Sequence, residues 1–296
     1  MGRVAVVCPA SSARFIPPIE AILRREHEVR VFDADGAIAA DQWADAVWCE
    51  WAGRHAAALA AYGRKPLVVR LHRYEADEAF FGEIRFDRLT LVSTSEHVLA
   101  RARLRADVPR AVVIPSIVDF GRFVLRPHQD TARVGIVADI HGRKQLGLAL
   151  QVLAALPAGV TMHHAGATRD PALARYLVRM TRFLGLEDRV TWHGEIPPDR
   201  MPGFWSDKAA CLSTSADEGC PYNVVEAMAC GVEAVVHWHE GAERLGASLW
   251  SSIPDAASAL LTAIETPRLA ALIRSAAESA FSIEENADDV LALFRR

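Results

Sequence analysis

The feature that most constrains the fold of this chain is the segment Ala210–Val236, which reads ACLSTSADEGCPYNVVEAMACGVEAVV. It begins and ends with short apolar runs that are typical of buried strands. A helix is expected from about Tyr222 to Cys230, because Pro221 suits the start of a helix and Gly231 suits the left-handed position after one. A strand, an acidic turn, a short helix and a second strand in this order predict a parallel α/β unit.

Two carboxylates, Glu218 and Glu226, bracket the start of this helix. The first N–H groups of a helix have no partner within the helix, and the helix dipole is positive at that end. The segment therefore predicts an anion site flanked by two hydrogen-bond acceptors. Such a site suits a phosphate that is linked to two hydroxyl-rich groups.

In each half of the chain, expected strands alternate with expected helices, and a polar loop at residues 120–132 separates the two halves. The expected strands are 4–8, 29–33, 46–50, 67–71, 90–93 and 111–114, then 134–137, 161–164, 189–192, 211–214 and 234–236. The expected helices are 17–25, 54–62, 96–105, 145–155, 171–184, 222–230, 255–265, 269–280 and 283–296. This alternation predicts two doubly wound parallel sheets, whose ligands bind at the carboxyl ends of the strands.

We expect an α/β protein with a first Rossmann-like domain at residues 1–125 and a second at 126–282, with the two sheets facing each other across a cleft. A last helix at 283–296 carries an apolar stripe and could cross back onto the first domain.

The composition excludes several classes of protein. The chain has 296 residues, a net charge of −4 and 51% hydrophobic residues, which favours a globular protein and gives no sign of a nucleic-acid partner. Its five cysteines show no paired spacing, and His237-x-His239 has no evident third ligand, so neither a disulfide framework nor a metal site is expected. No G-x-G-x-x-G follows the first strand, which argues against a nicotinamide-dependent enzyme. With no leader and no run of about 18 apolar residues, we expect a cytoplasmic protein, with peripheral membrane attachment left open.

The segment around Glu218 and Glu226 resembles the donor-binding segment of GT-B glycosyltransferases of the retaining family 4. The resemblance lies in the two glutamates, the Gly219–Pro221 turn and the AMACG ending of the helix. Further stretches resemble the same family: PLVVRLHRYE at 66–75, IPSIVDFGRF at 114–123, RVGIVADIHGRKQ at 133–145, HHAGA at 163–167 and RVTWHGEIPPDRM at 189–201.

The resemblance implies transfer of a sugar from a nucleotide diphosphate sugar to a hydroxyl acceptor, with retention at the anomeric carbon. It implies that Glu226 binds the ribose and that Glu218 binds a hydroxyl of the donor sugar. Arg143 and Lys144 would offset the diphosphate charge, and His72 would contact donor or acceptor. The remaining donor-binding residues are expected to be Gly219, Cys220, Tyr222, Asn223, Gly166 and Glu195. Neither a metal nor a cofactor other than the nucleotide sugar is implied.

Two departures from the family pattern keep other functions open. The strand glycine, Gly135, is followed by Ile136 where the family has an arginine, and the segment Pro9–Arg14 has no Gly-Gly pair. The alternatives are a non-catalytic subunit that binds a sugar nucleotide and a GT-B nucleotide-sugar epimerase. The sequence carries no signal for the donor sugar, the base, the acceptor or the oligomeric state.

Overall fold

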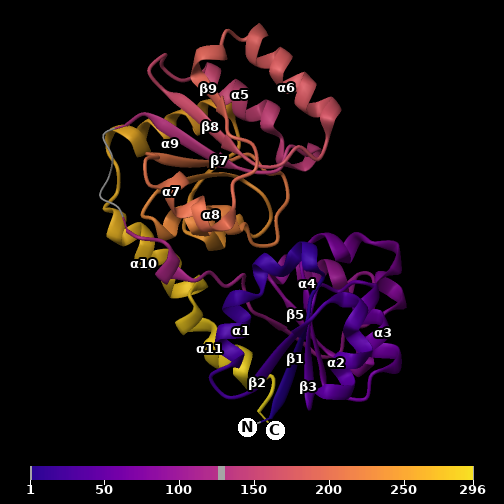
Figure 1. The fold of residues 1–296 in the computed structure, drawn as a ribbon. Helices are drawn as coiled ribbons and strands as arrows, with labels where there is room; N and C mark the ends of the chain where they lie inside the picture. Colours follow the sequence, from indigo (N-terminus) through magenta and orange to yellow (C-terminus); the bar gives the residue numbers. More distant parts are fainter. Residues whose placement is uncertain (1, 126–130, 296) are drawn as a thin grey trace. The chain divides into compact units, whose positions relative to one another are not determined.

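The computed structural model describes residues 2–125 and 131–295, which form two compact units. The first unit comprises the chain up to Val118 together with the residues from Ala280 onward, and the second comprises Asp119–Ser279 (Figure 1). The sequence-predicted domain boundary, between residues 125 and 126, borders a segment outside the described residues.

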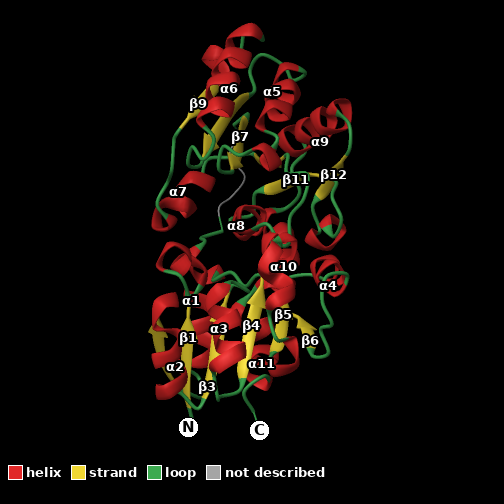
Figure 2. Ribbon diagram, turned by 90° about the vertical axis from the view of Figure 1, so that its right-hand side faces the viewer, coloured by secondary structure: helices red, strands yellow, loops and turns green. Residues whose placement is uncertain are grey.

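The first unit is built on a parallel sheet with the strand order β2-β1-β3-β4-β5-β6 (Figure 2). Its strands are β1 Arg3–Val7, β2 Glu28–Phe32, β3 Ala46–Glu50, β4 Leu67–Leu71, β5 Thr90–Ser93 and β6 Ala111–Val113. The central strands β3 and β4 are buried on both faces, as expected for a parallel sheet that is covered on both sides.

Helices cover both faces of this first sheet. On one face, α1 (Pro17–Leu23) and α11 (Ile283–Ala292) pack against Val4 and Val6 of β1. On the other face, α2 (Ala37–Trp43), α3 (Arg54–Tyr62) and α4 (Glu96–Arg103) pack against Ala5 and Val7. The helix α2 was not predicted from the sequence. Between β4 and β5 the chain forms three short 3-10 helices, at Tyr74–Asp77, Ala79–Glu83 and Phe86–Arg88.

The second unit is built on a parallel sheet with the order β12-β11-β10-β7-β8-β9. Its strands are β7 Arg133–Val137, β8 Thr161–Ala165, β9 Val190–Trp192, β10 Ala210–Ser213, β11 Glu233–His237 and β12 Ser248–Trp250. The edge strand β12 was not predicted. Two doubly wound parallel sheets confirm the predicted fold class.

Helices cover both faces of the second sheet. On one face, α5 (Leu146–Ala154), α6 (Pro171–Phe183) and α9 (Ile253–Glu265) pack against β7, β8 and β10. On the other face, Trp205 of α7 (Met201–Trp205) lies against Gly135 of β7, and α8 (Tyr222–Ala229) packs on β10 and β11. The short helix α7 was not predicted, and α10 spans Ala270–Phe281.

No single helix in the described part of the chain is long and apolar enough to cross a membrane. The helices α9 and α10 would reach that length only as a pair, which is bent by 118°.

The strand orders locate the point in each sheet where a ligand is expected. In the first sheet the chain moves from β1 outward to β2 and then returns to β3 on the other side of β1. In the second sheet it moves from β7 outward to β8 and β9 and then returns to β10. Ligands of open α/β sheets bind at such switch points, beyond the carboxyl ends of the strands. The expected places are the loops after β1 and β3 and those after β7 and β10.

Candidate functional site in the second unit

The switch point of the second sheet brings together three of the predicted site residues. Arg143 and Lys144 lie in a short 3-10 turn after β7, and Glu218 lies in the loop after β10. Nζ of Lys144 pairs with Oε1 of Glu218, and the Arg143 guanidinium lies 2.9 Å from Oε2 of the same carboxylate. One carboxylate thus holds two cations from a loop that is 74 residues away in the chain.

The carboxylate of Glu218 is held in its ionised form. Glu218 is buried, and burial by itself disfavours a carboxylate. Lys144 and Arg143 outweigh the burial and hold the pKa of Glu218 below its ordinary value, with a further hydrogen bond from Ser215. The three side chains together carry a net charge of about +1, which favours the binding of an anion.

Backbone contacts fix the two loops to each other. The Arg143 guanidinium donates to the carbonyl of Asp217 at 2.6 Å, and the Thr214 hydroxyl donates to the carbonyl of Lys144 at 2.6 Å. The amide of Ala216 donates to the carbonyl of Arg143 at 3.2 Å. The cations are therefore held at defined positions, as binding of a diphosphate requires.

The helix α8 follows this loop and carries Glu226 in its second turn, where the side chain is half-buried. Pro221 is the residue that precedes the helix, with φ −77° and ψ 100°, rather than its first helical residue. Gly231 has the predicted left-handed conformation (φ 80°), and a Cβ there would lie 2.7 Å from the side chain of Ala270. Gly219, Cys220, Tyr222 and Asn223 are all half-buried beside this helix start.

Gly166 and Glu195 lie at the same edge of the sheet, after β8 and β9. The amide of Gly166 donates to the carbonyl of Gly194 at 2.8 Å, which joins the two loops. A Cβ at Gly166 would lie 1.9 Å from the carbonyl oxygen of Ala138, so only glycine fits this position. Glu195 is exposed. The structure thus places both predicted residues beside the loop after β7.

The comparison of Gly135-Ile136 with the family's Gly-Arg pair was wrong. Gly135 lies in the middle of β7 against Trp205, and Ile136 is 1% exposed, so neither position can face a ligand. The residues that leave the strand are Ala138 and Asp139, and Asp139 pairs with Arg169 at 3.0 Å. An acidic residue therefore stands at the end of β7, and the cations of this loop come from the later turn.

The remaining predicted site residue, His72, belongs to the first unit and follows β4. Its Nε2 lies 2.7 Å from Oε1 of Glu50, the last residue of β3, and its side chain is 12% exposed. Burial disfavours the carboxylate of Glu50, but Arg70, His72 and Trp48 hold its pKa below the ordinary value. Burial also lowers the pKa of His72, although Glu50 opposes this change. The pair is therefore an ionised glutamate and a neutral histidine.

Sequence reasoning missed Glu50 and Arg70, which lie beside His72. Two signals were present in the sequence: Glu50 ends the apolar run AVWC, and Arg70 interrupts the apolar run LVVRL. Charged residues at buried strand positions are unusual unless they are paired. Here Arg70 lies 3.7 Å from Glu50 and both side chains are almost fully buried.

Within the described residues, no group of three or more histidine, cysteine, aspartate or glutamate side chains is arranged to hold a metal ion.

Comparisons with known proteins agree with this geometry. Residues 131–266 match the family model of the glycosyl transferases group 1, a range that contains both loops of the site and helix α8. The second unit is a group 1 glycosyltransferase domain. The prediction that the protein is a glycosyltransferase is thereby confirmed. No curated protein is significantly similar in sequence to the chain.

Solved structures that match both units of the chain confirm the predicted GT-B fold. The chain is similar to Anabaena HepE in complex with UDP-glucose, with a TM-score of 0.83 and 17% identity over 99% of each chain. It is similar to sucrose-phosphate synthase of Thermosynechococcus elongatus, with a TM-score of 0.80 and 15% identity over 100% of this chain and 98% of that one. A glycosyltransferase from Rickettsia africae matches with a TM-score of 0.79 and 12% identity over 99% of each chain.

Proposed function

We propose that the protein transfers a hexose from a UDP-sugar to a hydroxyl acceptor, with retention at the anomeric carbon and without a metal ion. The observation that carries the proposal is the convergence of Arg143, Lys144 and Glu218 at the switch point of a group 1 glycosyltransferase domain. UDP is the proposed nucleotide because the similar Anabaena structure holds UDP-glucose.

In the proposed donor complex, the diphosphate lies between the cations of the β7 loop and the first turn of α8. Both provide positive charge, so they stabilise the charge that develops on the leaving diphosphate. Glu218 then exchanges part of its pairing with the two cations for a hydroxyl of the sugar. Glu226, one to two turns into α8, accepts hydrogen bonds from the ribose hydroxyls.

The backbone of Gly166 lies so close to the carbonyl of Ala138 that no side chain fits at this position of the sheet edge. In the proposed complex this surface and the loop of Glu195 lie against the nucleobase. The acceptor hydroxyl loses its proton to the donor phosphate itself, so no side-chain nucleophile is required.

The test is an assay of UDP release and product formation with purified full-length protein, UDP-glucose and a panel of hydroxyl acceptors. Nuclear magnetic resonance of the product gives the anomeric configuration. An α-linked product from the α-linked donor is expected. A β-linked product would refute retention, and epimerised sugar nucleotide would identify an epimerase. Tight UDP binding with neither release nor transfer would favour the non-catalytic subunit.

A further inference from the structure

The switch point of the first sheet carries a cluster of four rings. Phe15 follows β1, Trp51 follows β3, and His72 and Tyr74 follow β4. We call these four residues the aromatic cluster. The rings of Trp51 and His72 are stacked, with centroids 3.8 Å apart and an interplanar angle of 23°. The ring centroid of Phe15 lies 5.6 Å from that of Trp51, edge to face, and the tilted ring of Tyr74 lies 5.4 Å from Trp51.

Trp51 is held in a backbone conformation that bulky residues rarely adopt. Its φ is 74°, in the left-handed region. A residue of this kind costs on the order of 1–3 kcal/mol and persists only where its surroundings enforce it, commonly at functional sites. Here the enforcing contact is Glu75, whose Oε1 accepts a hydrogen bond from the amide of Ala52 at 3.0 Å. The strained residue directs its ring onto His72.

The contact with Glu50 determines what His72 can offer to a ligand. Nε2 of His72 donates to the ionised carboxylate of Glu50, so the neutral ring keeps its proton on Nε2. Nδ1 then carries the lone pair and can accept a hydrogen bond from a hydroxyl. Glu50 is thus a positioning residue for His72.

We propose that the aromatic cluster is the acceptor site and that it binds a pyranose ring, with Trp51 and Tyr74 against the C–H face of the sugar and Nδ1 of His72 accepting from a hydroxyl. The inference rests on the proposed function, which requires a hydroxyl acceptor. It adds the chemical class of that acceptor and the residues that bind it.

A pyranose fits the cluster because it combines two kinds of surface. Its ring presents polarised C–H groups, which are attracted to the negative face of an aromatic ring. Its hydroxyls match the acceptor nitrogen of His72 and the hydroxyl of Tyr74, a side chain that is 47% exposed. An acyclic polyol has the hydroxyls but no rigid C–H face.

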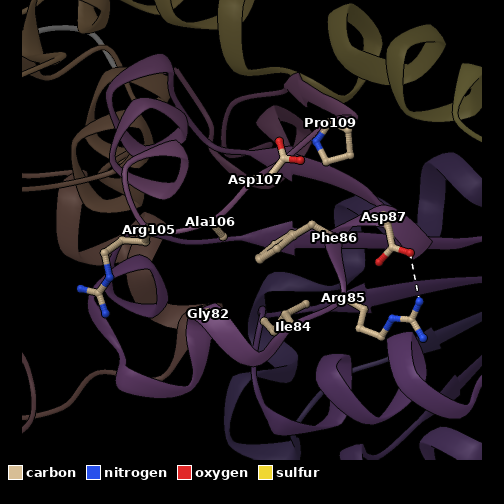
Figure 3. Close-up of a pocket in the computed structure, with 9 residues that line it drawn as sticks. All are labelled: Gly82, Ile84, Arg85, Phe86, Asp87, Arg105, Ala106, Asp107 and Pro109. Carbon is tan, nitrogen blue, oxygen red and sulfur yellow. Dashed lines mark hydrogen bonds and ion pairs between the residues drawn. The ribbon is translucent and has the colours of Figure 1, made fainter.

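The cavity in Figure 3 is a weaker candidate for this acceptor. It has a volume of about 290 Å³ and is lined by Gly82, Ile84, Arg85, Phe86, Asp87, Arg105, Ala106, Asp107 and Pro109. Phe86 and Asp87 precede β5, and Pro109 precedes β6, so the cavity lies at the amino ends of these strands. The aromatic cluster lies at the opposite, carboxyl edge, where ligands of such sheets bind.

The experiment is saturation-transfer nuclear magnetic resonance on the full-length protein with UDP present. The probes are methyl pyranosides of common hexoses, octyl glucoside, glycerol and sorbitol. Variants are Trp51→Gly, which suits the positive φ, and Tyr74→Leu. The matched control is Tyr62→Leu, which alters a tyrosine of the same unit that is 78% exposed in α3.

We expect at least one pyranoside to receive saturation, strongest on the C–H protons of one ring face, and the acyclic polyols to receive none. Trp51→Gly and Tyr74→Leu should each weaken that binding by about tenfold, because each removes an aromatic partner and the area that it buries. The control Tyr62→Leu should leave the binding unchanged. Binding of octyl glucoside but no methyl glycoside would assign the pyranose to a lipid headgroup, and binding of both would assign it to a glycan end.

Two results would overturn the proposal: no pyranoside signal in the unaltered protein, or a signal that both variants leave unchanged. The signals of UDP separate this failure from that of the proposed function. If UDP protons receive saturation and no pyranoside does, the acceptor site alone is refuted. If UDP protons receive no saturation, the donor site is refuted.

Discussion

Replacement of Glu75 by glutamine should make the first unit more stable at pH 8 than it is in the unaltered protein. Glu75 is 1% exposed, and one of its oxygens holds the amide of Ala52 beside the strained Trp51. Burial raises the pKa of Glu75 to about 8, and the nearby charge of Glu50 adds to this effect, although backbone hydrogen bonds oppose it. The folded protein therefore keeps a proton on Glu75 at neutral pH.

The size of the effect follows from the two pKa values. Below pH 4.5 the carboxyl is protonated in both the folded and the unfolded state, so its titration does not affect stability. Between pH 4.5 and about 8 only the unfolded state loses the proton, so the free energy of unfolding falls by about 1.4 kcal/mol per pH unit. The whole loss is about 5 kcal/mol, and glutamine, which does not titrate, avoids it.

Hydrogen exchange read at the amides of β4, corrected for the intrinsic rate at each pH, measures this free energy for the first unit by itself. The difference between Glu75→Gln and the unaltered protein should grow in favour of the variant from pH 5 to pH 8. The subtraction removes the contributions of histidines that titrate in the same range. Glu78→Gln, an exposed carboxylate in the same loop, should show no such trend. A difference that does not change with pH would refute the assignment of a protonated Glu75.

Three further predictions concern the second unit. Gly166→Ala should lower stability by about 1–3 kcal/mol or more in thermal unfolding, because its Cβ would clash with the carbonyl of Ala138, while Gly159→Ala, with open space, should not. Burial lowers the pKa of His164 to about 4. The free energy of unfolding should therefore fall by up to about 3 kcal/mol as the pH drops from 6.5 to 4, because only the unfolded state gains the proton in this range. The variant His164→Gln should remove this loss, and hydrogen exchange at the amides of β8 measures it. Glu218→Gln should not weaken UDP binding in calorimetry, because both cations remain and lose the carboxylate that competes with the diphosphate. The same variant should lower the rate of sugar transfer. Weaker UDP binding would contradict the proposal that these cations hold the diphosphate.

The sheets were the most predictable part of the fold. All eleven expected strands overlap strands of the two sheets, because short apolar runs are typical of buried parallel strands. The strand β12 was not predicted because Ser248–Trp250 is only three residues long and lies at an edge of the sheet. The helix α2 escaped because its seven residues carry too short an apolar pattern to show a period.

Within the donor site, residue types and spacing predicted which side chains would gather, but not how they would pair. Nothing in the sequence indicates that Glu218 would hold both Arg143 and Lys144, because this contact joins loops that meet only through the strand order. The error at Gly135 has the same origin. A motif that is compared by its letters does not show where the strand ends, and β7 continues to Val137.

The first unit shows the limit of sequence reasoning most clearly. His72 was predicted from its place at a strand end, but its partner Glu50 lies 22 residues earlier in a neighbouring strand. The left-handed backbone of Trp51 has no signature in the sequence, since tryptophan is disfavoured in that conformation. It is a tertiary feature, enforced by the buried contact between Glu75 and Ala52.

The central claim is that the second unit binds the donor nucleotide at Glu226 and the neighbouring cations, and calorimetric titration with UDP and GDP tests it most directly. The account predicts that UDP binds and that Glu226→Ala weakens its binding by about 1.5–3 kcal/mol, roughly 10- to 150-fold in Kd. Glu265→Ala, an exposed glutamate of α9, should leave the affinity unchanged. Binding of neither nucleotide, or equal UDP affinity in a folded Glu226→Ala protein, would contradict the account.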